Sequence, residues 1–204
     1  TIYSVNDHVA ISVPTAINVQ ATQNPHPSVD GYGYTPTVQL SLPLELRSGI
    51  YLVEQSIPLI VKPGGPVDIM VVYPSNTANA YEGSGGLSMY VTPNIRPTEV
   101  SFLRPQTLQA DAAYCLKWLE TTSYKIGYIA DSDLELASIL GSSKMLLVPG
   151  HSEYWTRKAR RNFDDFILRG GHALILSGNT MWWQVRYSPA GDKLICYRDS
   201  LSDP

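Results

Sequence analysis

The sequence predicts an α/β domain built on a parallel sheet with helices on both faces, preceded by a β-rich segment. Three observations predict this class. The sequence has four short apolar runs of strand character, apolar residues at helical spacing between them, and turn residues that separate the strand pattern from the helix pattern. Alternation of strands and helices along one chain gives a parallel sheet. The pattern changes near residue 63, so we expect a β-rich segment over residues 1–63 and the α/β domain over residues 64–204.

The first segment is expected to be all-β. Short β-branched or alternating runs are separated by Pro and Gly clusters that mark turns, and no helical period is found. Because a complete sandwich of the immunoglobulin kind needs about seven strands, we expect the tail of a sandwich. The predicted strands cover residues 9–13, 16–20, 36–42 and 49–53.

In the second segment, four strands are expected, and the continuous apolar run of the first, residues 67–73, is typical of a strand that is buried on both faces. The four strands cover residues 67–73, 124–130, 144–149 and 173–177. Apolar residues at helical spacing predict helices over residues 108–119 and 155–167, the latter ending at Gly170 and Gly171. Asp131 can begin a short helix that continues through Leu140. Residues 74–106 are expected to form a long polar, Gly-rich loop.

Composition excludes several classes of protein. The chain carries 15 Lys and Arg against 18 Asp and Glu, a net charge of −3, whereas a nucleic-acid-binding surface needs a basic excess. No apolar run reaches the roughly 18 residues of a membrane-spanning helix. Two cysteines give neither a disulfide framework nor a Cys-rich zinc site. We expect a cytoplasmic protein and a chain that is a piece of a longer one, truncated at its C-terminus.

The topology predicts where a site would lie. In a parallel α/β sheet, ligands bind beyond the carboxyl ends of the strands. The loops expected at this edge are residues 74–90, 150–155 and 178–183, and they hold most of the unusual side chains. We therefore expect the three loops to form one site.

The loop after the third strand carries His151 and Glu153 between a strand end and a helix start. The N-terminal end of a helix favours an ionised carboxylate. An ionised glutamate beside a histidine suits metal ligation or acid–base chemistry. The alternative is that Ser152 or Glu153 only caps the following helix, which is a common role.

The loop after the first strand is Gly-rich but lacks the spacing and the lysine of a phosphate-binding loop. It presents two phenols, Tyr81 and Tyr90, whose ordinary role would be packing with the hydroxyl in water.

The loop after the fourth strand carries no nucleophile. A strand-to-helix turn is expected there, with Asn179 at its apex, and the Gly-x-Ser-x-Gly motif is absent. Asn179 could orient a ligand or donate to an oxyanion. Trp182 and Trp183 either wall an apolar pocket or pack in the core. Five further side chains are placed outside the site: core packing is expected for Cys115 and Cys196, a structural position for His172, and no role for His8 and His26.

Several motifs together resemble the C-terminal domain of the large (beta) subunit of N,N-dimethylformamidase and its relatives. The most specific segments are Gly-His-Ser-Glu-Tyr-Trp from Gly150 and Gly-Asn-Thr-Met-Trp from Gly178. Weaker ones include Asn-Ala-Tyr ending at Tyr81, Arg104-Pro105 and Gly170-Gly171. The resemblance covers about residues 48–187.

The resemblance implies a class I glutamine-amidotransferase-like fold preceded by a β-sandwich. It also implies a hydrolase for the C–N bond of a small amide, with one ferric ion held by two tyrosines and a glutamate. The matching ligands are Tyr81, Tyr90 and Glu153, with Tyr114 as the alternative second tyrosine. His151 and Asn179 match residues around the metal, and a small partner subunit and a homo-oligomer are implied.

The implied ligands agree with the chemistry of the residues. Phenolate and carboxylate oxygens are hard donors that suit a ferric ion. His151 would carry a proton to the leaving amine, and Asn179 would steady the oxyanion. Two alternatives stay open: a non-catalytic structural or ligand-binding α/β domain of a larger, carbohydrate-related protein, and a metal-free hydrolase of the amidotransferase-like group.

Overall fold

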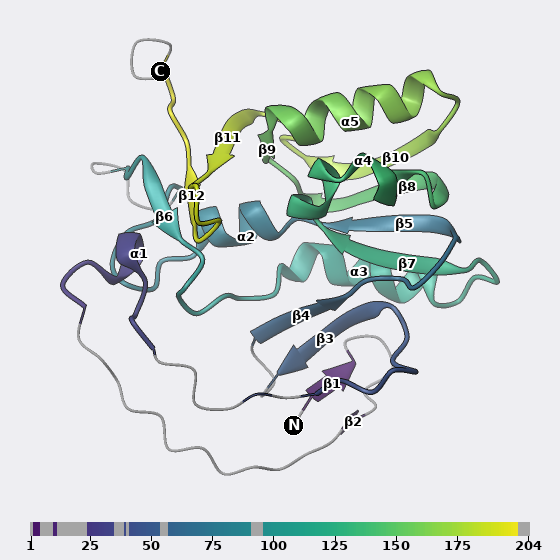
Figure 1. Ribbon diagram of the computed structural model, residues 1–204, viewed down its shortest axis with the longest axis horizontal. Coiled ribbons are helices and arrows are strands. Elements are labelled where there is room, and N and C mark those ends of the chain that lie inside the picture. Colours follow the sequence, from purple (N-terminus) through teal and green to yellow (C-terminus); the bar gives the residue numbers. More distant parts are fainter. Residues whose placement is uncertain are drawn as a thin grey trace.

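A computed structural model describes residues 2–4, 10–11, 24–34, 39, 41–53, 57–90 and 96–199. Its centre is a parallel four-stranded sheet in the order β10-β8-β5-β7 (Figure 1). All four strands coincide with predicted ones, so the α/β prediction with a parallel sheet is confirmed. The strands are β5 (Val67–Tyr73), β7 (Ile126–Ala130), β8 (Ser143–His151) and β10 (His172–Gly178).

Helices cover both faces of this sheet. Alternate residues of β5 enter two separate cores, which is why its sequence is apolar throughout. On one face α3 (Ala110–Leu119) packs Leu116 and Leu119 against the sheet. On the other face α5 (Arg157–Leu168) packs Phe163 and Phe166, beside η1 (Asp131–Glu135) and α4 (Ala137–Leu140). The two longer predicted helices are thus confirmed, with ends that differ by one or two residues, whereas the short helix predicted from Asp131 through Leu140 is divided into a 3-10 helix and a separate α-helix.

Two predictions about the connections are wrong. Residues 74–106 are not one long loop, because helix α2 (Ser75–Tyr81) and strand β6 (Glu99–Ser101) form within them. The fourth strand is not followed by a helix, because β11 (Trp183–Tyr187) begins there. Its alternating side chains favour a strand, and Val185 points into a core.

A second four-stranded sheet has the order β6-β12-β11-β9, with β9 (Tyr154–Thr156) and β12 (Lys193–Ile195). It encloses a third core that includes Ala80, Met89 and Cys196. Cys196 is buried there and Cys115 packs against the α3-side core, so the packing role expected for both cysteines is confirmed.

The N-terminal region contains an antiparallel sheet in the order β2-β1-β3-β4. Its strands are β1 (Ile2–Ser4), β2 (Ala10–Ile11), β3 (Gly49–Val53) and β4 (Ile57–Val61). A one-turn helix, α1 (Pro27–Asp30), contradicts the expectation that this segment is all-β. The predicted strand 16–20 lies outside the described residues. The predicted strand 36–42 is not a strand at its described residues 39, 41 and 42, which are exposed and have no face to bury.

The division at residue 63 into two domains stays a prediction. Ile50 of β3 belongs to the same core as α3, so the N-terminal sheet packs onto one face of the parallel sheet. Within the described residues, no helix has the length and apolar character needed to cross a membrane.

Candidate functional site

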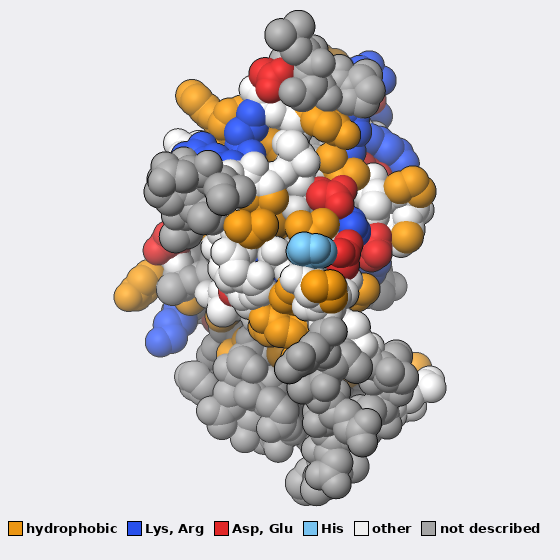
Figure 2. Space-filling view, turned by 90° about the vertical axis from the view of Figure 1, so that its left-hand side faces the viewer, with side chains coloured by type: hydrophobic (Ala, Val, Ile, Leu, Met, Phe, Trp, Pro, Cys, Tyr) orange, Lys and Arg blue, Asp and Glu red, His pale blue; other side chains and the backbone are white. Residues whose placement is uncertain are grey.

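The ends of three neighbouring strands bring the predicted site residues to one edge of the sheet. Tyr81 is the last residue of α2, which follows β5 after a single residue. Glu153 lies between β8 and β9, and His151 ends β8. In the sheet register His151 pairs with Gly178, the end of β10. Figure 2 shows this end of the molecule, where acidic, apolar and histidine side chains share one surface.

Helix α2 is fixed by buried polar contacts at its start. The Asn76 backbone N–H donates to Asp131 Oδ2 at 2.8 Å, and the Asn76 amide donates to the Tyr154 carbonyl at 3.0 Å. Asp131 is 2% exposed, and burial raises the pKa of its carboxyl to about 8 despite that hydrogen bond. The residues from Asn76 to Ala80 are all buried. The position of Tyr81 is therefore set by the body of the molecule.

Tyr81 and Glu153 form the central contact of the site. The Tyr81 hydroxyl donates to Glu153 Oε2 at 2.6 Å, although 72 positions separate the two residues. Glu153 is 4% exposed, and its backbone N–H donates to Thr77 Oγ1 at 2.9 Å. Burial, and then the hydrogen bond to Glu153, hold the pKa of Tyr81 well above its usual range. The phenol therefore keeps its proton unless a cation replaces it.

Tyr90 lies beside Tyr81. Their rings stack with centroids 4.3 Å apart and planes inclined by 20°, and the His151 ring centroid lies 6.1 Å from that of Tyr81. A cavity of about 580 Å³ is lined by all three rings, together with Glu82 and Gln109 among others. The structure thus brings Tyr81, Tyr90, Glu153 and His151 together.

Glycine makes room for His151. A Cβ atom on Gly178 would lie 2.7 Å from Cε1 of the His151 ring, so a side chain there would displace the imidazole. Gly150 has φ +74°, a conformation that side chains rarely adopt, and it packs against the backbone of Ala112. The backbone N–H of His151 donates to Gln109 Oε1 at 3.4 Å.

The other predicted residues stand apart from this group. Asn179 is exposed, has φ +48°, and none of the described contacts joins its side chain to Tyr81 or Glu153. Tyr114 is 82% exposed on α3, so Tyr90 is the tyrosine that accompanies Tyr81. Trp182 is exposed, whereas Trp183 packs against the third core. His172 begins β10 at the opposite edge of the sheet. His26 precedes α1, and His8 lies outside the described residues.

The capping interpretation of Ser152 and Glu153 is wrong. The cap of α5 is Thr156, whose hydroxyl accepts from the Ala159 N–H at 3.1 Å. Ser152 Oγ instead accepts from the Trp155 indole at 2.9 Å. Strand β9 separates Glu153 from the helix, and its carboxylate accepts instead from the Tyr81 hydroxyl.

The donor set at this edge consists of oxygen atoms. Among the described residues, no group of three or more His, Cys, Asp or Glu side chains could hold a metal ion. The side chain that contacts the Glu153 carboxylate is the phenol of Tyr81, and Tyr90 stacks on its ring. Two phenols and one carboxylate fit a hard trivalent cation such as Fe³⁺.

The chain matches the family model described as N,N-dimethylformamidase beta subunit-like, C-terminal, over residues 4–204. The chain belongs to this family. The resemblance inferred from the sequence motifs is therefore confirmed. A search of curated proteins found no match.

Three further side chains of this dimethylformamidase beta subunit-like chain, of which Thr77 and Arg104 are buried, were not singled out as site residues from the sequence. Thr77 holds the backbone of Glu153, Gln109 lines the cavity, and Arg104 is 5% exposed behind the two tyrosines. The signal for Arg104 was its place in the Arg104-Pro105 motif of the resemblance, which assigns it neither burial nor a role. No spacing rule indicates its burial.

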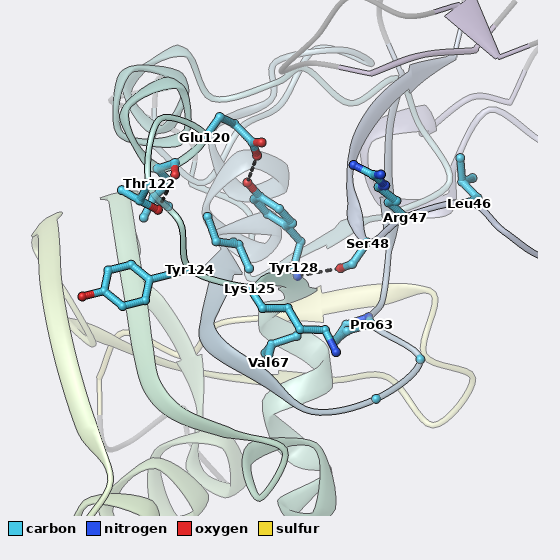
Figure 3. A pocket seen from close by; sticks show the side chains of 14 residues that line it. Leu46, Arg47, Ser48, Pro63, Val67, Glu120, Thr122, Tyr124, Lys125 and Tyr128 are labelled. Carbon is cyan, nitrogen blue, oxygen red and sulfur yellow. Dashed lines mark hydrogen bonds between the residues drawn. The ribbon is translucent and has the colours of Figure 1, made fainter.

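A larger cavity, of about 650 Å³, lies at the opposite edge of the sheet in this dimethylformamidase-like domain. Val67 and Ile126, the first residues of β5 and β7, line it. Figure 3 shows the Tyr128 hydroxyl donating to Glu120 Oε1, at 2.9 Å. The tyrosines and Glu153 lie at the other ends of these strands, so we place the candidate site in the smaller cavity.

Proposed function

We propose that this domain is the metal-bearing part of an amidohydrolase that cleaves the C–N bond of a small linear amide. In this proposal one ferric ion is held by Tyr81, Tyr90 and Glu153. The observation that carries it is the 2.6 Å contact between the Tyr81 hydroxyl and Glu153 Oε2, with Tyr90 stacked alongside.

The donor set supports a cation at this point. The Tyr81 proton lies between a phenol oxygen and a buried carboxylate oxygen, and both atoms would accept a cation in its place. A metal ion displaces protons from groups that are otherwise hard to ionise. Three anionic oxygen ligands suit Fe³⁺ better than softer or larger metals.

When bound, the ferric ion would supply Lewis acidity toward the amide carbonyl. The protein's own groups would manage the proton and orient the substrate. His151 lines the cavity beside Tyr81 and is the candidate to give a proton to the leaving nitrogen. Gln109 lines the same cavity and has an amide N–H₂ to orient a substrate. Asn179 has no described contact with this group, so its role as a donor to the oxyanion stays a prediction from the sequence.

Further parts of the same proposal concern the substrate and the assembly. A cavity of about 580 Å³ has room for amides larger than dimethylformamide. The parallel sheet ordered β10-β8-β5-β7, with helices on both faces, supports the class I glutamine-amidotransferase-like classification. The beta-subunit-like name of the family supports a small partner subunit and a larger complex.

The proposal is tested by the metal content and colour of the purified protein. We expect iron and a visible absorption band from phenolate-to-iron charge transfer. Glu153→Gln should lose the iron and the band, because the amide cannot replace an anionic ligand. Glu120→Gln, at the opposite edge of the sheet, is the matched control and should keep both.

Two results would contradict the proposal. Full iron occupancy in Glu153→Gln would reject the ligand assignment. A colourless, metal-free and inactive wild-type protein would favour the non-catalytic domain over the hydrolase.

A further inference from the structure

Arg104 is a buried cation that contacts two separate segments of the site. It follows β6 and is 5% exposed. One of these segments is the C-terminal part of α2, which ends at Tyr81. The other is residues 82–90, which end at Tyr90 and which we call the tyrosine loop.

The guanidinium group of Arg104 uses all three of its nitrogen atoms. On α2, Nε donates to Asn79 Oδ1 at 3.2 Å, and Nη2 donates to the Asn79 carbonyl. On the tyrosine loop, Nη1 donates to the carbonyls of Ser84 at 3.2 Å and Leu87 at 2.9 Å. Nε also donates to the Ser101 carbonyl at 3.1 Å, which ties both segments to β6.

These contacts reach carbonyls at the end of α2 and in the tyrosine loop, and the Asn79 carbonyl also accepts from the Glu82 N–H at 3.3 Å. The last carbonyls of a helix have no partner within it, and loop carbonyls have none in a sheet. The acceptors are neutral oxygens from three segments, and the guanidinium is planar and rigid. A shift of either segment would break hydrogen bonds in a buried place, where an unpaired group is costly.

The tyrosine loop also lies directly on α2. The Met89 N–H donates to the Ala80 carbonyl at 2.9 Å, and Ser88 Oγ donates to the same carbonyl at 3.1 Å. The Tyr90 N–H donates to Ser88 Oγ at 3.0 Å. The Tyr90 ring is 53% exposed, so neighbouring side chains alone do not hold it in its stack on Tyr81.

We propose that Arg104 is a positioning residue that fixes Tyr90 against Tyr81 by holding the tyrosine loop to the end of α2. The consequence of this positioning, that two phenol oxygens are placed to bind one ferric ion, rests on the proposed function. The stack of Tyr90 on Tyr81 can be measured in protein stripped of metal, separately from ferric ion binding.

The test compares Arg104→Gln with Arg160→Gln in the full chain. Arg160 is an exposed residue of α5 that pairs with Asp164 at 2.9 Å, so it controls for the loss of a positive charge. Tyrosine rings are isotopically labelled, and Tyr90→Phe identifies the Tyr90 signals by NMR. In the metal-free protein we expect Arg104→Gln to move the Tyr90 signals to those of an unstacked ring. Arg160→Gln should leave them unchanged.

The second measurement uses ferric ion alone, titrated in competition with citrate. Loss of a residue that orients metal ligands lowers metal affinity by about 10- to 100-fold, and we expect this of Arg104→Gln. Methylguanidinium added to Arg104→Ala should restore both the Tyr90 signals and ferric ion binding. A residue needed only for stability would lower the melting temperature without these changes in the folded protein.

A folded Arg104→Gln protein with wild-type Tyr90 signals and wild-type ferric ion affinity would overturn the inference. If that variant does not fold, the Tyr90 signals of Arg104→Lys provide the test. A lysine keeps the charge but cannot bind both segments, so we expect the signals of an unstacked ring. Failure of the wild-type protein to bind iron would reject the proposed function. The Tyr90 signals, recorded without metal, would still decide the role of Arg104.

Discussion

Tyr81 and Tyr90 share one stack but differ in what surrounds their hydroxyl groups. The Tyr81 hydroxyl donates to a carboxylate that is 4% exposed. For Tyr90, the structure gives no hydroxyl partner among the described residues, and the side chain is half-exposed. A buried acceptor depends on its donor, whereas an exposed hydroxyl exchanges its partner with water. The two tyrosines should therefore contribute differently to stability in the absence of metal.

We expect Tyr81→Phe to lower the free energy of unfolding of the metal-free protein by about 1.5–3 kcal/mol, the usual value of a hydrogen bond to a charged group. Tyr90→Phe, the matched control, should change it by less than about 0.5 kcal/mol. Urea unfolding measures both values. Equal effects of the two substitutions would show that the hydrogen bond between Tyr81 and Glu153 does not stabilise the metal-free protein.

The sequence could predict that a residue lies in the site where its position at the end of a strand determines its location in the fold. Glu153 and His151 follow a recognisable strand, and the carboxyl ends of parallel strands meet at one edge. Arg104 could not be predicted as buried, because its acceptors are carbonyls of α2 and the tyrosine loop, whose positions depend on the completed fold.

Helix α2 shows why an element can escape sequence analysis. Its residues from Asn76 to Ala80 are small or polar and all buried, so no apolar stripe distinguishes an inner from an outer face. Its stability comes from tertiary contacts, including the one from the Asn76 N–H to Asp131. An element of this kind is recognised only from the structure.

The carboxyl of Asp131 should make stability depend on pH. Its pKa is raised to about 8 in the folded protein, mainly by burial, against about 3.9 in an unfolded chain. Between these values the folded state keeps a proton that the unfolded state has lost, so this group destabilises the fold as pH rises from about 4 to 8. Asp131→Asn should remove this contribution and flatten the pH dependence, as measured by urea unfolding at several pH values.

Asp164→Asn serves as the control for that series, because Asp164 is exposed on α5 and pairs with Arg160 of the same helix. Its pH dependence should follow the wild type. A wild-type profile for Asp131→Asn would mean that Asp131 ionises normally in the folded protein.

On the scale of the whole molecule, the alternation of apolar strands and helical stripes was enough to predict the parallel sheet. The second sheet was not predicted, because its strands are short and come from distant parts of the chain. Residues 193–195 pair with residues 99–101, and no local sequence pattern predicts pairing between segments so far apart in the chain. The site lies where the two sheets approach, since β9 follows Glu153 directly.

A ferric ion bound at this place would connect three parts of the molecule: α2, the tyrosine loop and the end of β8. A ligand that binds only the folded state raises stability by mass action. We therefore expect removal of iron with a chelator to lower the melting temperature of the wild type, as measured by calorimetry, and re-addition of Fe³⁺ to restore it. Glu153→Gln should melt at the same temperature with or without chelator.

An unchanged melting temperature of the wild-type protein after its iron has been removed would contradict this expectation. It would indicate that the metal is held outside the three segments.

The long chain separation between Tyr81 and Glu153 has a consequence for the order of events during biosynthesis. The two side chains meet only after β5 has paired with β8, a non-local step that forms slowly in parallel sheets. The nascent chain therefore lacks the pairing of Tyr81 with Glu153, and the proposed ferric ion would bind only after the sheet has assembled. Refolding in the presence of iron should gain nothing over supplying iron to the refolded protein.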